Sequence, residues 1–279
     1  MKRAFLNGAK KLVVKVGTSV LTCEGRFDRS RIQVLARDIA ALLKKGIRVS
    51  LVTSGAIGAG MTLMKMKRRP VSMPGLQAAA AVGQRYLMQC YEEGFSKHGY
   101  STAQVLLTWD DLAHKERFMN AKRTLHEIQK FKHVPVINEN DTVATDEIRF
   151  GDNDRLSGLL AILLQADVLV ILSDTNGLYA GGRKAGSAKR IKAVEKIDEV
   201  FGHVSDKKNS FTVGGMHSKL NAIRATVRAG IPVFLADGRE NGVLKKIFKG
   251  EDVGTFFSPS KSTRDKKSWI RNFIEHIKG

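Results

Sequence analysis

The sequence contains few cysteines and no long apolar run. Its two cysteines, Cys23 and Cys90, show no paired spacing, which is typical of a reducing cytoplasm and not of a disulfide framework. A membrane-spanning helix needs about 20 consecutive apolar residues, and no such stretch occurs. The opening residues, MKRAFLNGAKK, also lack an apolar stretch long enough for a signal peptide. The sequence therefore predicts a cytoplasmic protein that does not enter a membrane.

Several phosphate, dinucleotide and metal motifs are also missing. No GxxxxGK[ST] sequence is present, which excludes a Walker-type phosphate loop as far as a motif can. The glycines of residues 54–60, SGAIGAG, do not follow the GxGxxG order of a dinucleotide-binding turn. The histidines show no metal-ligand spacing, and residues 152–154, DND, lack the glycine and distal glutamate of a calcium loop. No dedicated metal site is predicted.

Negative charge is scarce, and the formal net charge is +20 at pH 7. A basic surface can bind nucleic acid when lysines and arginines cluster along it. Here they are dispersed in short groups without interleaved aromatic residues, at 65–69, 183–192 and 261–267. We therefore favour a solvated basic surface that concentrates anionic substrates, with nucleic-acid binding as the alternative.

Apolar runs alternate with segments of helical periodicity along the whole chain. Strands are predicted at residues 11–16, 47–53, 101–107, 134–137, 168–172 and 231–236. Helices are predicted at residues 30–43, 75–98, 108–130 and 156–164, and from Gly215 to Ala229, and Thr108 with Asp111 resembles a capping box. Such alternation predicts a single α/β domain over residues 1–279, with parallel strands and helices on both faces of one sheet.

Polar and glycine residues follow most of these strands. In open parallel sheets, binding sites lie beyond the carboxyl ends of the strands, so these groups should converge. Two lysines, Lys15 and Lys219, occur beside such glycine turns. Backbone N–H groups at a helix N-terminus bind phosphate, a lysine adds a point charge, and phosphoryl transfer depends mostly on positioning and charge neutralisation. The pattern therefore favours phosphoryl transfer.

Most of these residues also have an ordinary structural interpretation. Lys15 is the exception, because an unpaired ammonium group inside an apolar strand is costly. Lys219 could simply be an exposed helix residue. Ser54 could serve merely as the N-cap of a helix, without contacting a ligand. The other candidates could be turn or cap residues that make only local hydrogen bonds. They are Asp141, Asn153, Asp154, Ser173 and Asp174.

Seven stretches together match a known family in its own order: KLVVKVGTSVLT from Lys11, LVTSGAIGAGM from Leu51, GLQAAAAVGQ from Gly75, AQVLLTWDD from Ala103, NENDTVATDEIRFGDNDRLSGLLA from Asn138, ADVLVILSDTNGLY from Ala166 and GGMHSKLNAI from Gly214. They resemble the glutamate 5-kinases, the γ-glutamyl kinases of proline synthesis, within the amino acid kinase family. The resemblance covers about residues 10–270. It implies a three-layer αβα sandwich around one open, mainly parallel sheet, the amino acid kinase fold, and a kinase that forms γ-glutamyl phosphate.

The resemblance also implies roles for individual residues. Catalytic roles fall on Lys15 and Lys219, with Asp154 organising the two lysines. Glutamate binding falls on Ser54, Gly55, Ala56, Asp141 and Asn153. ATP binding falls on Lys15, Gly17, Thr18, Ser173, Asp174, Val213, Gly214, Gly215, Met216, His217, Ser218 and Lys219. ATP is the implied cofactor, with Mg²⁺ bound mainly through the nucleotide.

Two departures from the family pattern affect the predicted ATP site. Thr212-Val213 stands where the family usually has Gly-Thr, which removes a hydroxyl and a flexible glycine, and Ser173 replaces a common threonine. The choice of acceptor is also open at this stage. Related kinases phosphorylate N-acetylglutamate, aspartate, carbamate or UMP on the same fold, and a non-catalytic nucleic-acid-binding or regulatory protein is a further alternative.

Larger-scale expectations follow from the same resemblance. About residues 1–170 would form the amino-acid-substrate half and 171–270 the nucleotide half, followed by a short tail at 271–279. Many bacterial relatives continue after a Lys/Arg-Trp-Ile sequence into a PUA domain, whereas here Lys267-Ser268-Trp269-Ile270 precedes only nine residues, RNFIEHIKG, which predicts that this domain is absent. A homo-oligomer and feedback inhibition by proline are also implied.

Overall fold

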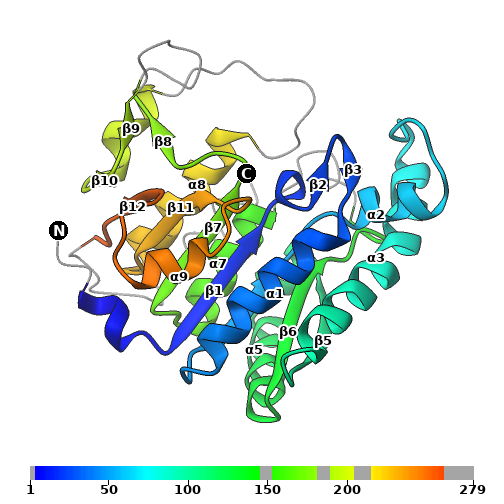
Figure 1. The fold of residues 1–279 in the computed structure, drawn as a ribbon, viewed down its shortest axis with the longest axis horizontal. Helices are drawn as coiled ribbons and strands as arrows, with labels where there is room; N and C mark the ends of the chain where they lie inside the picture. Colours follow the sequence, from blue (N-terminus) through cyan, green and yellow to red (C-terminus); the bar gives the residue numbers. More distant parts are fainter. Residues whose placement is uncertain (1–3, 145–152, 181–188, 204–214, 261–279) are drawn as a thin grey trace.

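The computed structural model describes residues 4–144, 153–180, 189–203 and 215–260. An eight-stranded sheet lies at its centre, with the strand order β10-β12-β11-β7-β1-β4-β6-β5 (Figure 1). Its strands are β1 (Lys11–Val16), β4 (Arg48–Val52), β5 (Ser101–Leu107), β6 (His133–Glu139), β7 (Val168–Ser173), β10 (Ala193–Val194), β11 (Val233–Asp237) and β12 (Thr255–Phe257). Each neighbouring pair is parallel except β11 and β12, which confirms the predicted, mainly parallel sheet.

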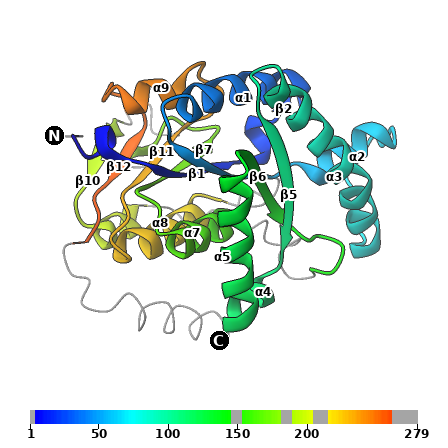
Figure 2. The ribbon, with the colours of Figure 1, turned by 90° about the horizontal axis from the view of Figure 1, so that it is seen from below.

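Helices cover both faces of the sheet, so the three-layer arrangement is confirmed (Figure 2). The helices are α1 (Arg29–Leu43), α2 (Ala56–Leu63), α3 (Met73–Ser96), α4 (Trp109–Ala113), α5 (Lys115–Lys130), α7 (Asn153–Leu164), α8 (Met216–Arg228) and α9 (Val243–Phe248). Figure 2 shows α1 and α9 on one side of the sheet and α5, α7 and α8 on the other.

Alternate residues of β1 belong to different layers. Leu12, Val14 and Val16 pack in the apolar core formed with α1, α3 and α9. Val13 packs in the opposite core, which is formed with α5, α7 and α8. Because side chains alternate along a strand, Lys15 lies on the same face as Val13. The strand register therefore directs Lys15 toward α7 and α8.

The predicted elements agree closely with the observed ones, with one correction. β1 and β5 have the predicted bounds, and the capping box of Thr108 and Asp111 is formed. The predicted helix over residues 108–130 is wrong as one element, because it is divided into α4 and α5 at His114. The backbone of His114 is extended (φ −94°, ψ 120°), and its N–H donates to the carbonyl oxygen of Asp110 at 3.2 Å, which closes α4.

Several short elements accompany the sheet and its helices. They are the 3-10 helices η1 (Ala4–Gly8), η2 (Thr18–Val20) and η3 (Ile197–His203), and the strand pairs β2 (Thr22–Cys23) with β3 (Arg26–Phe27) and β8 (Leu178–Tyr179) with β9 (Arg190–Ile191). The predicted excursion at 180–190 falls largely outside the described residues, at 181–188.

Connections run in opposite directions on the two sides of β1. The chain leaves β1 toward β4, β6 and β5, and later returns to β7 and β11 on the other side. In open α/β sheets such a change of direction places a crevice at the carboxyl ends of the strands. The ends of β1, β4 and β7 are therefore where the architecture favours a site.

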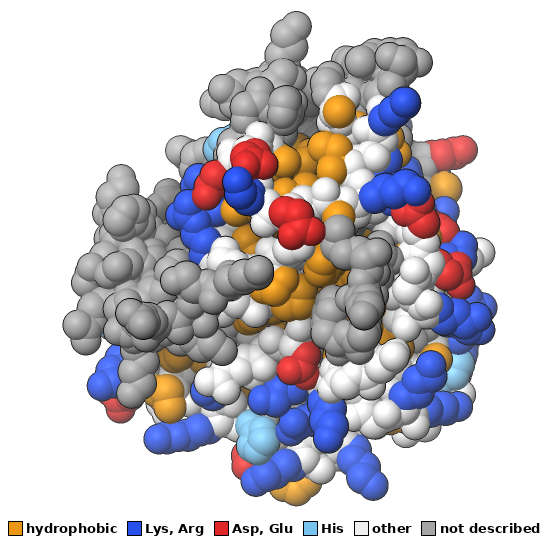
Figure 3. All heavy atoms as spheres, turned by 90° about the vertical axis from the view of Figure 1, so that its left-hand side faces the viewer, with side chains coloured by type: hydrophobic (Ala, Val, Ile, Leu, Met, Phe, Trp, Pro, Cys, Tyr) orange, Lys and Arg blue, Asp and Glu red, His pale blue; other side chains and the backbone are white. Residues whose placement is uncertain are grey.

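Figure 3 shows Lys and Arg side chains at several separate places on one face, with Asp and Glu among them. Within the described ranges, none of the helices combines the length and apolar character required to cross a bilayer.

Candidate active site

Two lysines meet one aspartate at the carboxyl end of β1. Lys15 Nζ lies 2.7 Å from Asp154 Oδ1, and Lys219 Nζ lies 3.1 Å from Asp154 Oδ2. Asp154 is 0% exposed, Lys15 4% and Lys219 8%. Each residue belongs to a different element, namely β1, the first turn of α7 and the first turn of α8. The structure thus brings together the three residues with predicted catalytic roles.

The electrostatics of this group favour an ionised aspartate. Burial alone would raise the pKa of the Asp154 carboxyl. The nearby charges of Lys15 and Lys219, together with their hydrogen bonds, outweigh burial and hold this pKa below its ordinary value. The N-terminus of α7 adds a favourable partial positive charge. One carboxylate and two ammonium groups leave a net positive charge in a buried place, which suits the binding of a phosphoryl group.

A second group of polar side chains surrounds Asn153, the residue before Asp154. Its Nδ2 lies 2.6 Å from the carbonyl oxygen of Thr53, 3.0 Å from Ser54 Oγ and 2.9 Å from Asn138 Oδ1. An amide has only two hydrogens for these three acceptors, so one hydrogen is shared. Asn138 Nδ2 in turn donates to Gln84 Oε1 at 2.8 Å. These contacts tie α7 to the ends of β4 and β6 and to α3.

Two buried polar atoms in this second group have no partner within the part of the chain that the structure describes. They are Asn153 Oδ1, an acceptor, and Gln84 Nε2, a donor. Both residues are 8% exposed. Leaving a buried polar group unpaired costs about 1–3 kcal/mol, so such atoms call for a partner. A polar small molecule bound beside Asn153 would supply one.

The glycine at the end of β4 has a special backbone conformation. Gly55 is the N-cap of α2 and has φ +99°, in the left-handed region that favours glycine. No side chain caps this helix, so Ser54 is not its N-cap, and the first N–H groups of α2 remain available for an anion. Ala56 begins α2 and is buried.

Close packing of two helices fixes α2 against α3. A Cβ atom at Gly60 would overlap the carbonyl oxygen of Ala79, and one at Gly83 would overlap the carbonyl oxygen of Ala56. Only glycine permits this approach, which holds the Gly55 turn in place.

The ends of β1 and β7 carry residues with predicted roles in ATP binding. The Gly17 N–H donates to the Leu172 carbonyl oxygen at 3.0 Å, while Thr18 is exposed. Ser173 Oγ donates to Asp174 Oδ1 at 3.1 Å. The Asp174 carbonyl oxygen accepts from Arg239 at 2.7 Å, a contact that the sequence analysis did not foresee.

Several predicted residues lie at the start of α8 or in the turn after β6. Gly215 is the N-cap of α8 and has no side-chain cap, and it is followed by Met216, His217 and Ser218. Asp141 lies in the turn after β6, where its charge acts on Arg69: burial lowers the pKa of Arg69 and Asp141 opposes that shift. Val213 and Gly214 are outside the described residues, as are the predicted departures at 212–213.

The sequence analysis missed Gln84 as a site residue. Its signal is a polar side chain within an alanine-rich helix, on a face that turns out to be buried. Asn138 was recognised only as part of a polar strand end. Both residues lie in stretches that carry the family resemblance, but no short motif assigns them a role, because both act through contacts made by the fold.

Comparisons with known proteins show which family the chain resembles. Residues 10–237 match the model of the amino acid kinase family. The chain is 45% identical over 263 residues to a glutamate 5-kinase of Thermus thermophilus, covering 94% of this chain and 71% of that protein. It is 41% identical over 277 residues to a glutamate 5-kinase of Pseudomonas fluorescens, covering 98% of this chain and 74% of that protein.

Two solved structures share the fold at low sequence identity. A carbamate kinase from Giardia lamblia, bound to AMP-PNP, gives a TM-score of 0.65 at 16% identity, covering 90% of this chain and 99% of that chain. A UMP kinase from Bacillus anthracis gives a TM-score of 0.58 at 18% identity, covering 91% and 98%. At these identities the structures support the architecture alone.

Proposed function

This chain belongs to the amino acid kinase family and, within it, to the glutamate 5-kinases, and from that premise we propose that it phosphorylates the side-chain carboxylate of L-glutamate with ATP. The product is γ-glutamyl 5-phosphate, and the reaction is the first step of proline biosynthesis. The observation that best supports the proposal is the contact of Lys15 and Lys219 with one buried aspartate, Asp154. Two cations held at one place suit the charge of a phosphoryl group in transit.

No general base is required for this reaction. The side-chain carboxylate of glutamate has an ordinary pKa of about 4.3 and is ionised at neutral pH. It attacks the γ-phosphorus of ATP in line, and ADP leaves. Lys15 and Lys219 neutralise the charge that spreads over the equatorial oxygens, while Asp154 positions both ammonium groups.

Magnesium is proposed to arrive with the nucleotide. The described residues include no group of three or more His, Cys, Asp or Glu side chains arranged to hold a metal ion. We therefore propose that the ion is bound mainly by phosphate oxygens and water, as Mg²⁺ commonly is. The ion would offset the negative charge of the nucleotide, while the protein contributes the two lysines.

Glutamate is proposed to bind between the ends of β4 and β6 and the start of α7. Ser54, Gly55 and Ala56 offer the uncapped N-terminus of α2 to a carboxylate. Asn153 Oδ1 offers an acceptor to the α-ammonium group of glutamate. Asp141, in the turn after β6, would add a negative charge for the same ammonium group. Gln84 and Asn138 hold the Asn153 amide in orientation.

ATP is proposed to bind on the other side of Asp154, beyond β1, β7 and the start of α8. The residues assigned there are Gly17, Thr18, Ser173, Asp174, Gly215, Met216, His217 and Ser218, with Val213 and Gly214 before them. Gly17 is buried, and its N–H donates to the Leu172 carbonyl oxygen at 3.0 Å. The uncapped N-terminus of α8 offers N–H groups to phosphate oxygens.

A direct test compares acceptors. ADP release is measured with a coupled assay using glutamate, N-acetylglutamate, aspartate, carbamate or UMP as the acceptor. We expect a strong preference for glutamate, and a preference for any other acceptor would refute the assignment. A non-catalytic nucleic-acid-binding protein would instead show tight, salt-sensitive RNA or DNA binding and no ADP release.

Assembly, regulation and location are finer proposals. Membership of this family supports a homo-oligomer, feedback inhibition by proline at or near the glutamate site, and a cytoplasmic location. Sedimentation of the purified chain and inhibition kinetics with proline against glutamate would test the first two.

A further inference from the structure

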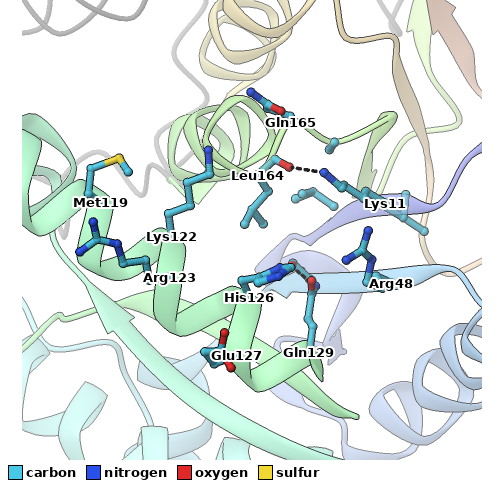
Figure 4. A pocket seen from close by; sticks show the side chains of 14 residues that line it. Lys11, Arg48, Met119, Lys122, Arg123, His126, Glu127, Gln129, Leu164 and Gln165 are labelled. Carbon is cyan, nitrogen blue, oxygen red and sulfur yellow. Dashed lines mark hydrogen bonds between the residues drawn. The ribbon is translucent and has the colours of Figure 1, made fainter. Parts of the chain in front are cut away.

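A cavity of about 360 Å³ lies at the opposite end of the strands from Asp154. Its walls come from α5, the end of α7 and the first residues of β1 and β4 (Figure 4). The residues that matter for its chemistry are Lys11, Arg48, Ser50, Lys122, His126 and Gln129. Since Lys11 begins β1 and Lys15 is near its end, the cavity is separate from the proposed active site.

Positive charge dominates this cavity. Lys11, Arg48 and Lys122 come from three different elements, and Figure 4 shows their charged groups around Leu164. Glu127 also lines the cavity, but its carboxylate is paired with Lys130 at 2.7 Å. The negative charge of Glu127 is therefore already compensated by a residue of its own helix.

The positively charged side chains of the cavity form no ion pair within the described part of the chain, although the backbone N–H groups of Lys10 and Lys11 donate to Asp167 Oδ2 at 2.7 and 2.8 Å. No carboxylate there forms an ion pair with Lys11, Arg48 or Lys122, and Lys11 Nζ meets only the Leu164 carbonyl oxygen at 3.4 Å. All three residues are half-buried. Like charges in a partly dehydrated hollow repel each other, and screening by salt is weaker there than on an open surface. A bound anion would remove that repulsion.

We propose that this cavity binds a small oligophosphate anion. Guanidinium and ammonium groups from several directions match the many acceptor oxygens of linked phosphates. Ser50 and Gln129, which are hydrogen-bonded at 3.0 Å, add neutral polar groups to the wall. The volume of about 360 Å³ is in the range of small-molecule sites, so a compact ligand fits it. The shared chemistry is an oligophosphate, either free or as the tail of a nucleotide.

The test titrates the intact protein by calorimetry at fixed ionic strength. Inorganic tripolyphosphate is used in one arm and cytidine triphosphate in the other. The proteins are the wild type, Lys122→Gln, the double variant Arg48→Gln/Lys122→Gln, and the control Lys115→Gln. Lys115 begins the same helix α5 but does not line the cavity, so its replacement removes an equal charge elsewhere.

We expect the affinity for tripolyphosphate to fall about tenfold or more in the double variant, and by an intermediate factor in Lys122→Gln. The control should change it by less than about twofold, as expected for screened long-range charge. A nucleotide ligand would be indicated if cytidine triphosphate binds more tightly than tripolyphosphate with the same dependence on the variants.

Two results would overturn the proposal. Equal affinity in the wild type and both cavity variants would place the bound phosphate elsewhere, such as at Lys15 and Lys219. An equal loss in Lys115→Gln would indicate unspecific attraction to a basic protein. Because Lys122 is on the helix surface, its single variant remains informative if the double variant fails to fold. None of these residues is in the proposed catalytic site, so turnover of glutamate is expected to be unchanged and serves as a folding control.

Discussion

Positive charge is paired at one end of the parallel strands and forms no ion pair at the other, among the described residues. At the carboxyl end, Lys15 and Lys219 are buried and share the carboxylate of Asp154. At the amino end, Arg48 and Lys122 are half-buried around a cavity without an acidic partner in the described residues. A deeply buried charge is stable only when the protein supplies an opposite charge or hydrogen bonds. A charge that remains near solvent is hydrated and can stay unpaired until a ligand binds. Removing charge should therefore have opposite consequences at the two ends.

The largest effect is expected from Asp154→Asn. This substitution leaves two buried ammonium groups without their counter-charge, and removing one partner of a buried ion pair costs about 3–5 kcal/mol. We expect a lower free energy of unfolding by denaturant and a loss of about 10³ in kcat, because neither lysine is held in position. A stable variant with nearly normal kcat would show that Asp154 organises nothing.

The contribution of Asp154 should also depend on pH in a defined direction. Its pKa is lowered in the folded state, so the folded protein binds fewer protons at this group than the unfolded chain. Its stabilisation is present above the unfolded pKa of about 3.9 and is lost as pH falls through the folded value. The difference in unfolding free energy between wild type and Asp154→Asn should be constant from about pH 5 to 8 and should shrink only below about pH 4. A difference that shrinks near pH 7 would contradict this assignment.

Replacement of either lysine comes next. Lys15→Ala or Lys219→Ala should lower kcat by about 10² or more, as the loss of a preorganised charge does. The matched control is Lys11→Ala, which removes the same side chain from the other end of β1 and should change kcat by less than about threefold. Near-normal kcat in Lys15→Ala would remove its catalytic assignment.

A smaller effect is expected from Gln84→Ala. Without Gln84 Oε1, the Asn138 amide loses its partner and Asn153 is less well oriented. One such hydrogen bond contributes about 0.5–1.5 kcal/mol, so KM for glutamate should rise about two- to tenfold while KM for ATP is unchanged. Gln84→Glu keeps the acceptor and should restore most of the affinity. An equal rise in both KM values would indicate a general structural defect instead.

The smallest effect is expected at the amino end. Lys122→Gln should raise the free energy of unfolding by a few tenths of a kcal/mol at low salt, since it relieves repulsion with Arg48 and Lys11. The gain should vanish in about 1 M salt, where charges are screened within about 3 Å. Destabilisation by this substitution would show that the cavity cations are compensated after all.

Secondary structure could be predicted from the sequence because burial imposes periodicity on each segment. The strands at 11–16 and 101–107 and the capping box at Thr108 agree with the structure, since each depends on residues close in sequence. The break at His114 was not predicted, because the apolar pattern continues on both sides of it. The lysine inside an apolar strand, Lys15, was the clearest local indication of a site.

What the sequence determined by itself is thus the order of the elements, the alternation that gives the sheet, and the types of side chain available for chemistry. Only the tertiary structure decided which of them meet. Lys15, Asp154 and Lys219 lie far apart in the chain and come together because the register of β1 directs Lys15 toward α7 and α8. Gln84 and the cavity at Lys122 are likewise products of packing. Periodicity records how each residue alternates between core and solvent, whereas contacts between distant segments depend on crossovers and register that no local pattern encodes.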